Sequence, residues 1–133
     1  MVARTEKPLS FRPRMVLAYA DSARAALNAR HFRRLGWEVH LACSGPEARR
    51  LVHALRPQIV LLDTDLRGES GWLTCAKLTL GGTGQRVLLV DEQVTPSREE
   101  LAGIVGAAGL VSWQAGLPAL VEEVHGAALP TSA

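Results

Sequence analysis

Three segments of the chain are short apolar runs with no polar residue at alternate positions. They are residues 15–20, 59–62 and 86–90, the last of which opens with Arg86. A short run of this kind predicts a strand that is buried on both faces, as in the middle of a parallel sheet. Two further segments also predict strands: 37–43 alternates more, which indicates a strand near the sheet edge, and 110–113 is a short strand.

Apolar residues recur at helical spacing between several of these strands. The segments 23–35, 72–80 and 117–126 predict helices on this pattern. In the first of these helices, the apolar stripe expected to face the core consists of Leu27, His31 or Phe32, and Leu35.

Two other helices are marked by capping boxes, in which a hydroxyl residue is followed three positions later by a glutamate. Ser44 and Glu47 begin one such helix, which ends before Pro57. Ser97 and Glu100 begin the other. The expected inward face of this second helix consists of Leu101, Ile104, Val105 and Ala108.

Strands and helices therefore alternate along the chain, five of each. This alternation predicts an α/β fold with a doubly wound, five-stranded parallel sheet and helices on both faces. Each apolar run is followed by a carboxylate, at Asp21, Asp63 and Asp91. Ligands bind at the carboxyl ends of such strands, so carboxylates on neighbouring strands would converge on a site suited to Mg²⁺. An aspartate after a strand can also cap the next helix.

Composition bounds the classes of function. The 133 residues suit one domain, which we place at 15–125, between a basic arm at 1–14 and a tail at 126–133. The net charge of +2 does not indicate nucleic-acid binding. No apolar run approaches the ~20 residues of a membrane span, and the start lacks a signal sequence, so we expect a cytoplasmic protein. Cys43 and Cys75 are expected to be buried free thiols.

Several short motifs occur along the chain in a fixed order. Gly36–Val39 is a Gly-aromatic-x-Val step, Ser44–Ala48 is Ser-Gly-x-Glu-Ala, and Gly106–Val111 ends in a Gly-Leu-Val run. Asp63 is followed eight positions later by Gly71. In this order and spacing the chain resembles the receiver domains of bacterial two-component response regulators, which have a flavodoxin-like (βα)5 fold. The resemblance implies that Asp63 stands at the position that accepts a phosphoryl group from a histidine kinase, with Mg²⁺ as cofactor.

The chain departs from this family at the metal site. The acidic pair that holds Mg²⁺ in the family falls on Tyr19 and Ala20, neither of which supplies a carboxylate. The remaining candidate ligands are Asp63, Asp21, which lies one position late, and Asp65, whose backbone carbonyl occupies the family's ligand position.

The chain also departs from the family at the switch positions. Asp91 stands where the family has a serine or threonine, Leu110 where it has a tyrosine, and Trp113 where it has a lysine. The only lysines of the chain are Lys7 and Lys77, and we expect neither to supply the missing ammonium. Loss of positive charge and gain of a carboxylate both disfavour the transfer of a phosphoryl group to an aspartate.

Three hypotheses follow. The favoured one is an atypical receiver, not an enzyme, which signals with weak or no phosphorylation of Asp63. The alternative is a phosphoacceptor with a rearranged site, in which Asp91 replaces the missing metal ligands and Arg67 replaces the lysine. A third is a small phosphatase of the haloacid-dehalogenase type, since Asp63-Thr64-Asp65 matches the Asp-x-Asp of that class.

The resemblance also implies the kind of partner. We expect a histidine kinase or another signalling protein, and a homodimer through the face formed by residues 97–126. Trp113 is either an anchor on that face or a filler of the space that the lysine leaves. We expect neither nucleic acid nor a membrane as a partner.

Overall fold

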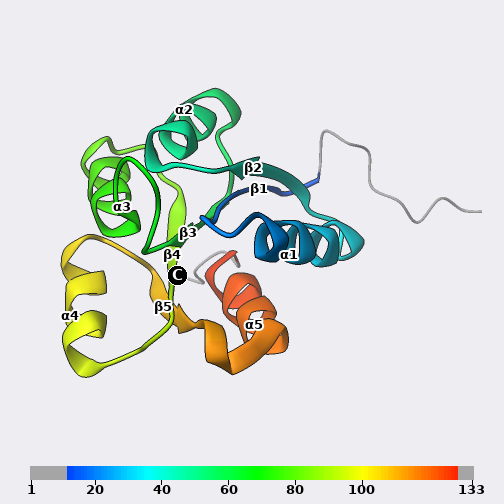
Figure 1. The fold of residues 1–133 in the computed structure, drawn as a ribbon. Helices are drawn as coiled ribbons and strands as arrows, with labels where there is room; N and C mark the ends of the chain where they lie inside the picture. The colour runs from blue at the N-terminus through cyan, green and yellow to red at the C-terminus, as the bar shows by residue number, and fades with distance from the viewer. Residues whose placement is uncertain (1–11, 129–133) are drawn as a thin grey trace, which may run out of the picture.

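The computed structural model describes residues 12–128, which form a parallel sheet with helices on both faces (Figure 1). A short 3-10 turn, η2 (Trp113–Ala115), follows the last strand. The strands are β1 (Arg14–Ala18), β2 (Glu38–Ala42), β3 (Ile59–Asp63), β4 (Arg86–Asp91) and β5 (Gly109–Ser112). The helices are α1 (Ser22–Arg34), α2 (Gly45–Leu55), α3 (Gly71–Leu80), α4 (Pro96–Ile104) and α5 (Gly116–Ala128).

All neighbouring strands pair in parallel, in the order β2-β1-β3-β4-β5. The predicted doubly wound, five-stranded parallel sheet is therefore confirmed, as is the edge position of β2. The order also makes β1, β3 and β4 neighbours, so their carboxyl ends meet at one edge of the sheet.

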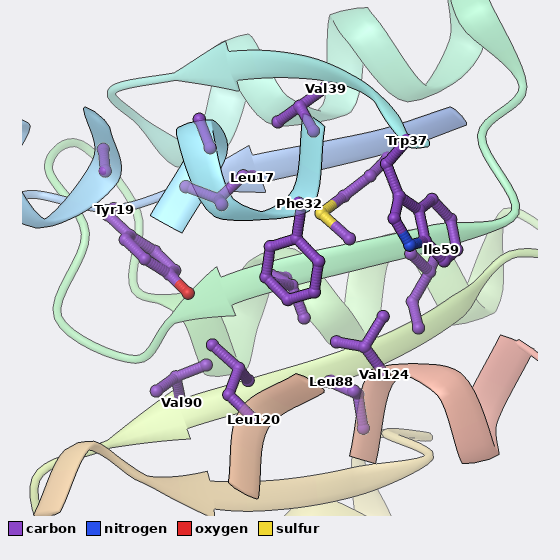
Figure 2. Packing of buried hydrophobic residues seen from close by; sticks show 14 of the residues in the cluster. Leu17, Tyr19, Phe32, Trp37, Val39, Ile59, Leu88, Val90, Leu120 and Val124 are labelled. Carbon is purple, nitrogen blue, oxygen red and sulfur yellow. The ribbon is translucent and has the colours of Figure 1, made fainter. Parts of the chain in front are cut away.

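The central strands divide their side chains between two cores, as strand geometry requires. Met15, Leu17 and Tyr19 point to the core under α1 and α5, where Phe32 and Val124 also pack (Figure 2). The intervening residues of the strands point to the second core, under α2, α3 and α4. All five residues of β3 are buried, so the apolar run at its start has no solvent-facing side.

The helix starts follow their capping residues. Ser44 Oγ accepts a hydrogen bond from the Glu47 amide at 3.2 Å, so Ser44 is the predicted N-cap of α2. The Glu47 carboxylate accepts from the Cys43 amide at 2.9 Å, one residue before the cap, so the reciprocal half of the capping box is not formed in the predicted way.

The second predicted capping box is wrong: Thr95, not Ser97, caps α4, and its hydroxyl accepts from the Arg98 amide at 3.2 Å. Pro96 explains the earlier start, because proline favours the first helical position, where its missing N–H is not needed.

Two expected apolar faces are only partly correct. At α4, Ile104 is 73% exposed and Leu101 is 39% exposed, whereas Ala102 is buried and Val105 packs partly buried against the core. At α1, Leu27 and Leu35 are exposed but Phe32 is buried, because the helix turns Ala25, Asn28, Ala29 and Phe32 toward the sheet. Alanines in both helices allow close approach to the sheet.

Three boundary and burial predictions also need correction. β1 begins at Arg14 and ends at Ala18, so Tyr19 and Ala20 lie in the loop after it. Helix α5 continues to Ala128, so the first residues of the predicted tail are helical. Cys75 is a buried free thiol as expected, but Cys43 is exposed.

The predicted arm lies mainly in residues 1–11, outside the described part of the chain, and residues 129–133 of the predicted tail also lie outside it. No helix within residues 12–128 is long and apolar enough to cross a membrane.

A buried carboxylate fixes the loop between β3 and α3. Glu69 is 8% exposed and pairs with Arg49 of α2 at 3.0 Å and with Lys77 of α3 at 2.8 Å. It also accepts a hydrogen bond from the Thr74 hydroxyl at 2.7 Å. Burial opposes the charged form of Glu69, but these hydrogen bonds outweigh it and lower its pKa to about 2. The loop that follows Asp63 is therefore tied to two helices by charge.

Gly71 lets α3 begin directly against the end of β3. A Cβ at this position would overlap the carbonyl oxygen of Asp63 and lie 2.8 Å from Thr64 Cα, both of which are backbone atoms that cannot turn aside. The spacing between Asp63 and Gly71 therefore has a packing cause in this structure.

We predict that Gly71→Ala lowers the free energy of unfolding by about 2 kcal/mol or more, since overpacking against backbone forces α3 or β3 to shift. Urea unfolding measures this change. Gly126→Ala is the matched control, because a Cβ at this helical position meets nothing within 4 Å. Alanine there should leave stability unchanged or raise it by about 0.5–1 kcal/mol. Equal stability of the Gly71→Ala protein and the wild type would contradict the close-approach argument.

Candidate functional site

The carboxyl ends of β1, β3 and β4 open into a cavity of about 790 Å³. All the strand-end carboxylates predicted to converge, Asp21, Asp63 and Asp91, line it. The other lining residues are Ala20, Arg24, Thr64, Asp65, Trp72, Glu92, Gln93, Arg98, Trp113 and Gln114.

Asp63 is the central carboxylate of this cavity and is 7% exposed. Its oxygens accept hydrogen bonds from the Asp65 amide at 3.0 Å and, more weakly, from the Ala20 amide at 3.4 Å. Burial raises the pKa of Asp63, and the charge of Asp65 adds to this effect. The two amides and the more distant charge of Arg24 oppose it. Asp63 is therefore a buried carboxylate that is held by backbone amides.

The residues at the family's acidic pair have other roles here. Tyr19 is 1% exposed and lies in the core, at the arrowhead end of the strands (Figure 2). Its hydroxyl donates to Asn28 Oδ1 at 3.5 Å, and burial, together with the nearby charge of Asp63, raises its pKa. Ala20 contributes only its amide to Asp63.

The other candidate metal ligands lie on the rim. Asp21 Oδ1 accepts from the amides of Ala23 and Arg24 at 2.9 and 3.1 Å, so it is the N-cap of α1. Both Asp21 and Asp65 are exposed. Within residues 12–128, no group of three or more His, Cys, Asp and Glu side chains is placed to hold a metal ion. Asp21, which caps α1, and the exposed Asp65 side chain therefore do not gather with Asp63 into a ready-made cluster of metal ligands.

Asp91 lies beside this centre and is fully engaged. It is 9% exposed, and its Oδ2 accepts the Thr64 hydroxyl at 2.9 Å. Its Oδ1 accepts from the Arg98 guanidinium and from the Gln93 amide, both at 3.2 Å. The acid at this switch position is therefore neutralised by an arginine of α4.

An aromatic and cationic stack forms another wall of the cavity. The Trp113 ring contacts Tyr19 edge-on, with ring centroids 4.6 Å apart, and the Arg24 guanidinium lies 4.2 Å from the centroid of the indole. Such contacts favour one orientation of the indole. Trp113 therefore fills the space beside the site and is half-buried there.

Two of the remaining candidates lie elsewhere. Arg67 is exposed, and its carbonyl accepts from the Gly45 amide at 3.4 Å; it is not among the residues that line the cavity. Leu110 is half-buried and packs against the core under α2, α3 and α4.

Arg24, Arg98 and Thr64 are site residues that were not predicted from the sequence. Arg24 follows the predicted cap Asp21 by three positions, which places it in the first turn of a helix that starts at the site. That position is a usable signal in the sequence. Arg98 follows Asp91 by seven positions across a loop, and its direction depends on a helix start that was misplaced.

We predict that Asp63→Asn raises stability at neutral pH, because it removes a buried charge that has no cationic hydrogen-bond partner among the described residues. A raised folded-state pKa stabilises the protein relative to the unfolded chain at low pH, and this contribution is lost as pH rises through that pKa. The gain from Asp63→Asn in urea unfolding should therefore be larger at pH 7 than at pH 3. Glu122→Gln, at an exposed site on α5, is the control. An equal or smaller gain at pH 7 than at pH 3 would contradict the prediction.

Comparison with known proteins reports on the fold. No family model matches the chain, and no curated protein matches it significantly. Solved structures match closely in shape. A CheY-like receiver domain protein from Methanospirillum hungatei JF-1 has a TM-score of 0.81 and 16% identity, over 88% of this chain and 94% of that one.

Two further structures agree with this match. The beryllofluoride-activated receiver domain of RstA from Klebsiella pneumoniae has a TM-score of 0.81 and 20% identity, over 88% and 99% of the two chains. The receiver domain of the putative response regulator NarL from Mycobacterium tuberculosis has a TM-score of 0.80 and 22% identity, over 88% and 96%. The chain therefore has the flavodoxin-like fold of the CheY-like receiver domains of response regulators.

Proposed function

We propose that this chain is an atypical receiver domain of two-component signal transduction, which acts through protein contacts with weak or no phosphorylation of Asp63. The observation that carries the proposal is the Asp91–Arg98 ion pair at 3.2 Å, in a cavity with few other cations. The receiver fold of the structural neighbours supports the class of function.

Charge at the cavity supports the weak-phosphorylation part of the proposal. The cavity is lined by five carboxylates and two arginines. Arg98 is paired with Asp91, and Arg24 lies on the Trp113 ring. Transfer of a phosphoryl group to Asp63 adds negative charge, which preorganised cations must stabilise. Neither arginine makes a hydrogen bond to Asp63 among the contacts of the described residues.

A functional phosphoacceptor remains the second candidate, for a specific reason. Asp63 keeps its place at the end of the central strand, with two backbone amides on its oxygens and Gly71 packed behind it. In this alternative Asp91 would leave Arg98 and join Asp63 around Mg²⁺.

The phosphatase hypothesis has less support. Asp65 is exposed, and its amide, not its carboxylate, contacts Asp63. Lys77 is engaged with Glu69 and is not among the residues that line the cavity. The structural neighbours named above are receiver domains. We therefore propose signalling without enzymatic activity.

The partner in this proposal is a histidine kinase or another signalling protein. The surface formed by residues 97–126 would carry the contact, or a homodimer. Leu101 and Ile104 of α4 are exposed there, which gives this surface apolar side chains to bury on association. Trp113 is half-buried under Arg24, which favours its role as a filler of the site.

We predict that incubation with acetyl phosphate and Mg²⁺ yields at most a minor fraction of protein carrying one added phosphoryl group, because the site lacks free positive charge. Intact-mass spectrometry with and without hydroxylamine, which cleaves acyl phosphates, measures this fraction. Asp63→Asn is the control for transfer elsewhere. A Mg²⁺-dependent, hydroxylamine-sensitive adduct on most of the wild-type protein, absent from Asp63→Asn, would overturn the proposal in favour of the phosphoacceptor.

A further inference from the structure

We infer that the Asp91 carboxylate is a built-in substitute for an external oxyanion: it occupies the donors of Thr64 and Arg98 and thereby holds the first turn of α4 against the end of β3. This inference rests on the proposed function and deepens it, because it describes how the same site is regulated without an added group. In this inference, the contact of Asp91 with Thr64 and Arg98 competes with any anion that enters the cavity and is therefore autoinhibitory.

The geometry is a chain of hydrogen bonds across three elements. Thr64, directly after β3, donates its hydroxyl to Asp91 Oδ2 at 2.9 Å, and Arg98 of α4 donates to Oδ1 at 3.2 Å. Asp91 itself ends β4. The carboxylate and the hydroxyl are both buried, whereas the Arg98 side chain is 41% exposed. The arginine therefore reaches in from the surface to an anion that the sheet supplies.

The same arginine also organises the start of α4. The Arg98 amide donates to the capping Thr95 hydroxyl at 3.2 Å, and its guanidinium also donates to the Gln93 carbonyl at 3.4 Å. The Gln93 amide in turn donates to Asp91 Oδ1. Residues at the start and the end of the β4–α4 connection, Gln93 and Arg98, therefore both donate to the Asp91 carboxylate.

Packing holds α4 less firmly than the other helices on its face of the sheet. Ala102 is its only buried residue, whereas α3 buries Gly71, Thr74, Cys75 and Leu78. A methyl side chain buries little apolar area, so the polar chain through Asp91 supplies a large share of what positions α4. Charge-assisted hydrogen bonds are about twice as strong as neutral ones, which suits them to this role.

The two donors would also suit an anion from solution. A hydroxyl and a guanidinium that converge on one carboxylate can bind another carboxylate or a phosphate in its place. In the wild type an incoming anion must displace Asp91, which is tethered at high effective concentration, and must also approach Asp63. Removal of the Asp91 carboxylate should therefore create an anion site from residues that are already in position.

Chemical rescue tests this inference. In Asp91→Ala, amide hydrogen exchange across residues 92–104 should become about tenfold faster or more, because the links from Thr64 and Arg98 are lost. Sodium acetate or formate should slow this exchange again in a saturable manner, whereas sodium chloride at equal ionic strength should not. Wild-type exchange should not respond to acetate. Addition of Arg98→Met to the Asp91→Ala protein should abolish the rescue. Asp65→Ala removes an exposed carboxylate of the same cavity and should leave exchange in α4 unchanged.

Three outcomes would overturn the inference: exchange in α4 unchanged by Asp91→Ala, no difference between acetate and chloride, or rescue that survives Arg98→Met. If Asp91→Ala does not fold, a double-mutant cycle with Asp91→Asn and Arg98→Met, read as exchange across 92–104, decides the question. Coupling of less than about twofold between the two changes would then overturn it. Wild-type phosphorylation, which tests the proposed function, is measured separately, so failure of one is distinguishable from failure of the other.

Discussion

The burial of β3 on both faces is the constraint on which the rest of the structure depends. All five residues of the strand are buried, its side chains divide between the two cores, and its last residue is Asp63. A carboxylate at the end of such a strand is held with little freedom, because the strand cannot shift without disturbing both cores. Gly71 behind it and Glu69 in the following loop fix the same point from the α3 side. Packing of the strand and the loop therefore places the site.

The proposal of weak or no phosphorylation rests on the balance of charge at that point. Asp63 keeps its backbone amides, but the residues around it pair with one another. Asp91 forms an ion pair with Arg98 and accepts a hydrogen bond from Thr64, and the Arg24 guanidinium lies over the Trp113 ring. A neighbourhood in which each cation already has a partner stabilises the resting arrangement and gains little from an added anion. The same pairing links the end of β4 to α4, whose outer face presents Leu101 and Ile104 to solvent.

The sheet and the position of Asp63 could be predicted from the sequence because apolar runs, breaks and caps are local signals. The charge pairs of the site could not be predicted from the sequence, because they depend on helix starts and tertiary contacts. In α4, the Ser97–Glu100 pattern imitates a capping box, while Pro96 and Thr95 set the true start. Ala102, not Ile104, faces the sheet, and the Arg98 guanidinium reaches Asp91. Arg24 and Trp113 are far apart in sequence, and only the tertiary fold brings them into contact.

The central claim is that the cations around Asp63 are already occupied by partners within the cavity. A titration with beryllofluoride and Mg²⁺, read by tryptophan fluorescence, tests it most directly, because Trp72 and Trp113 both line the cavity. The account predicts no saturable, Mg²⁺-dependent change in the wild type, with the fold intact by circular dichroism. A saturable change that Asp63→Asn abolishes would contradict it, since the cavity would then accept a phosphoryl mimic despite its internal charge pairs.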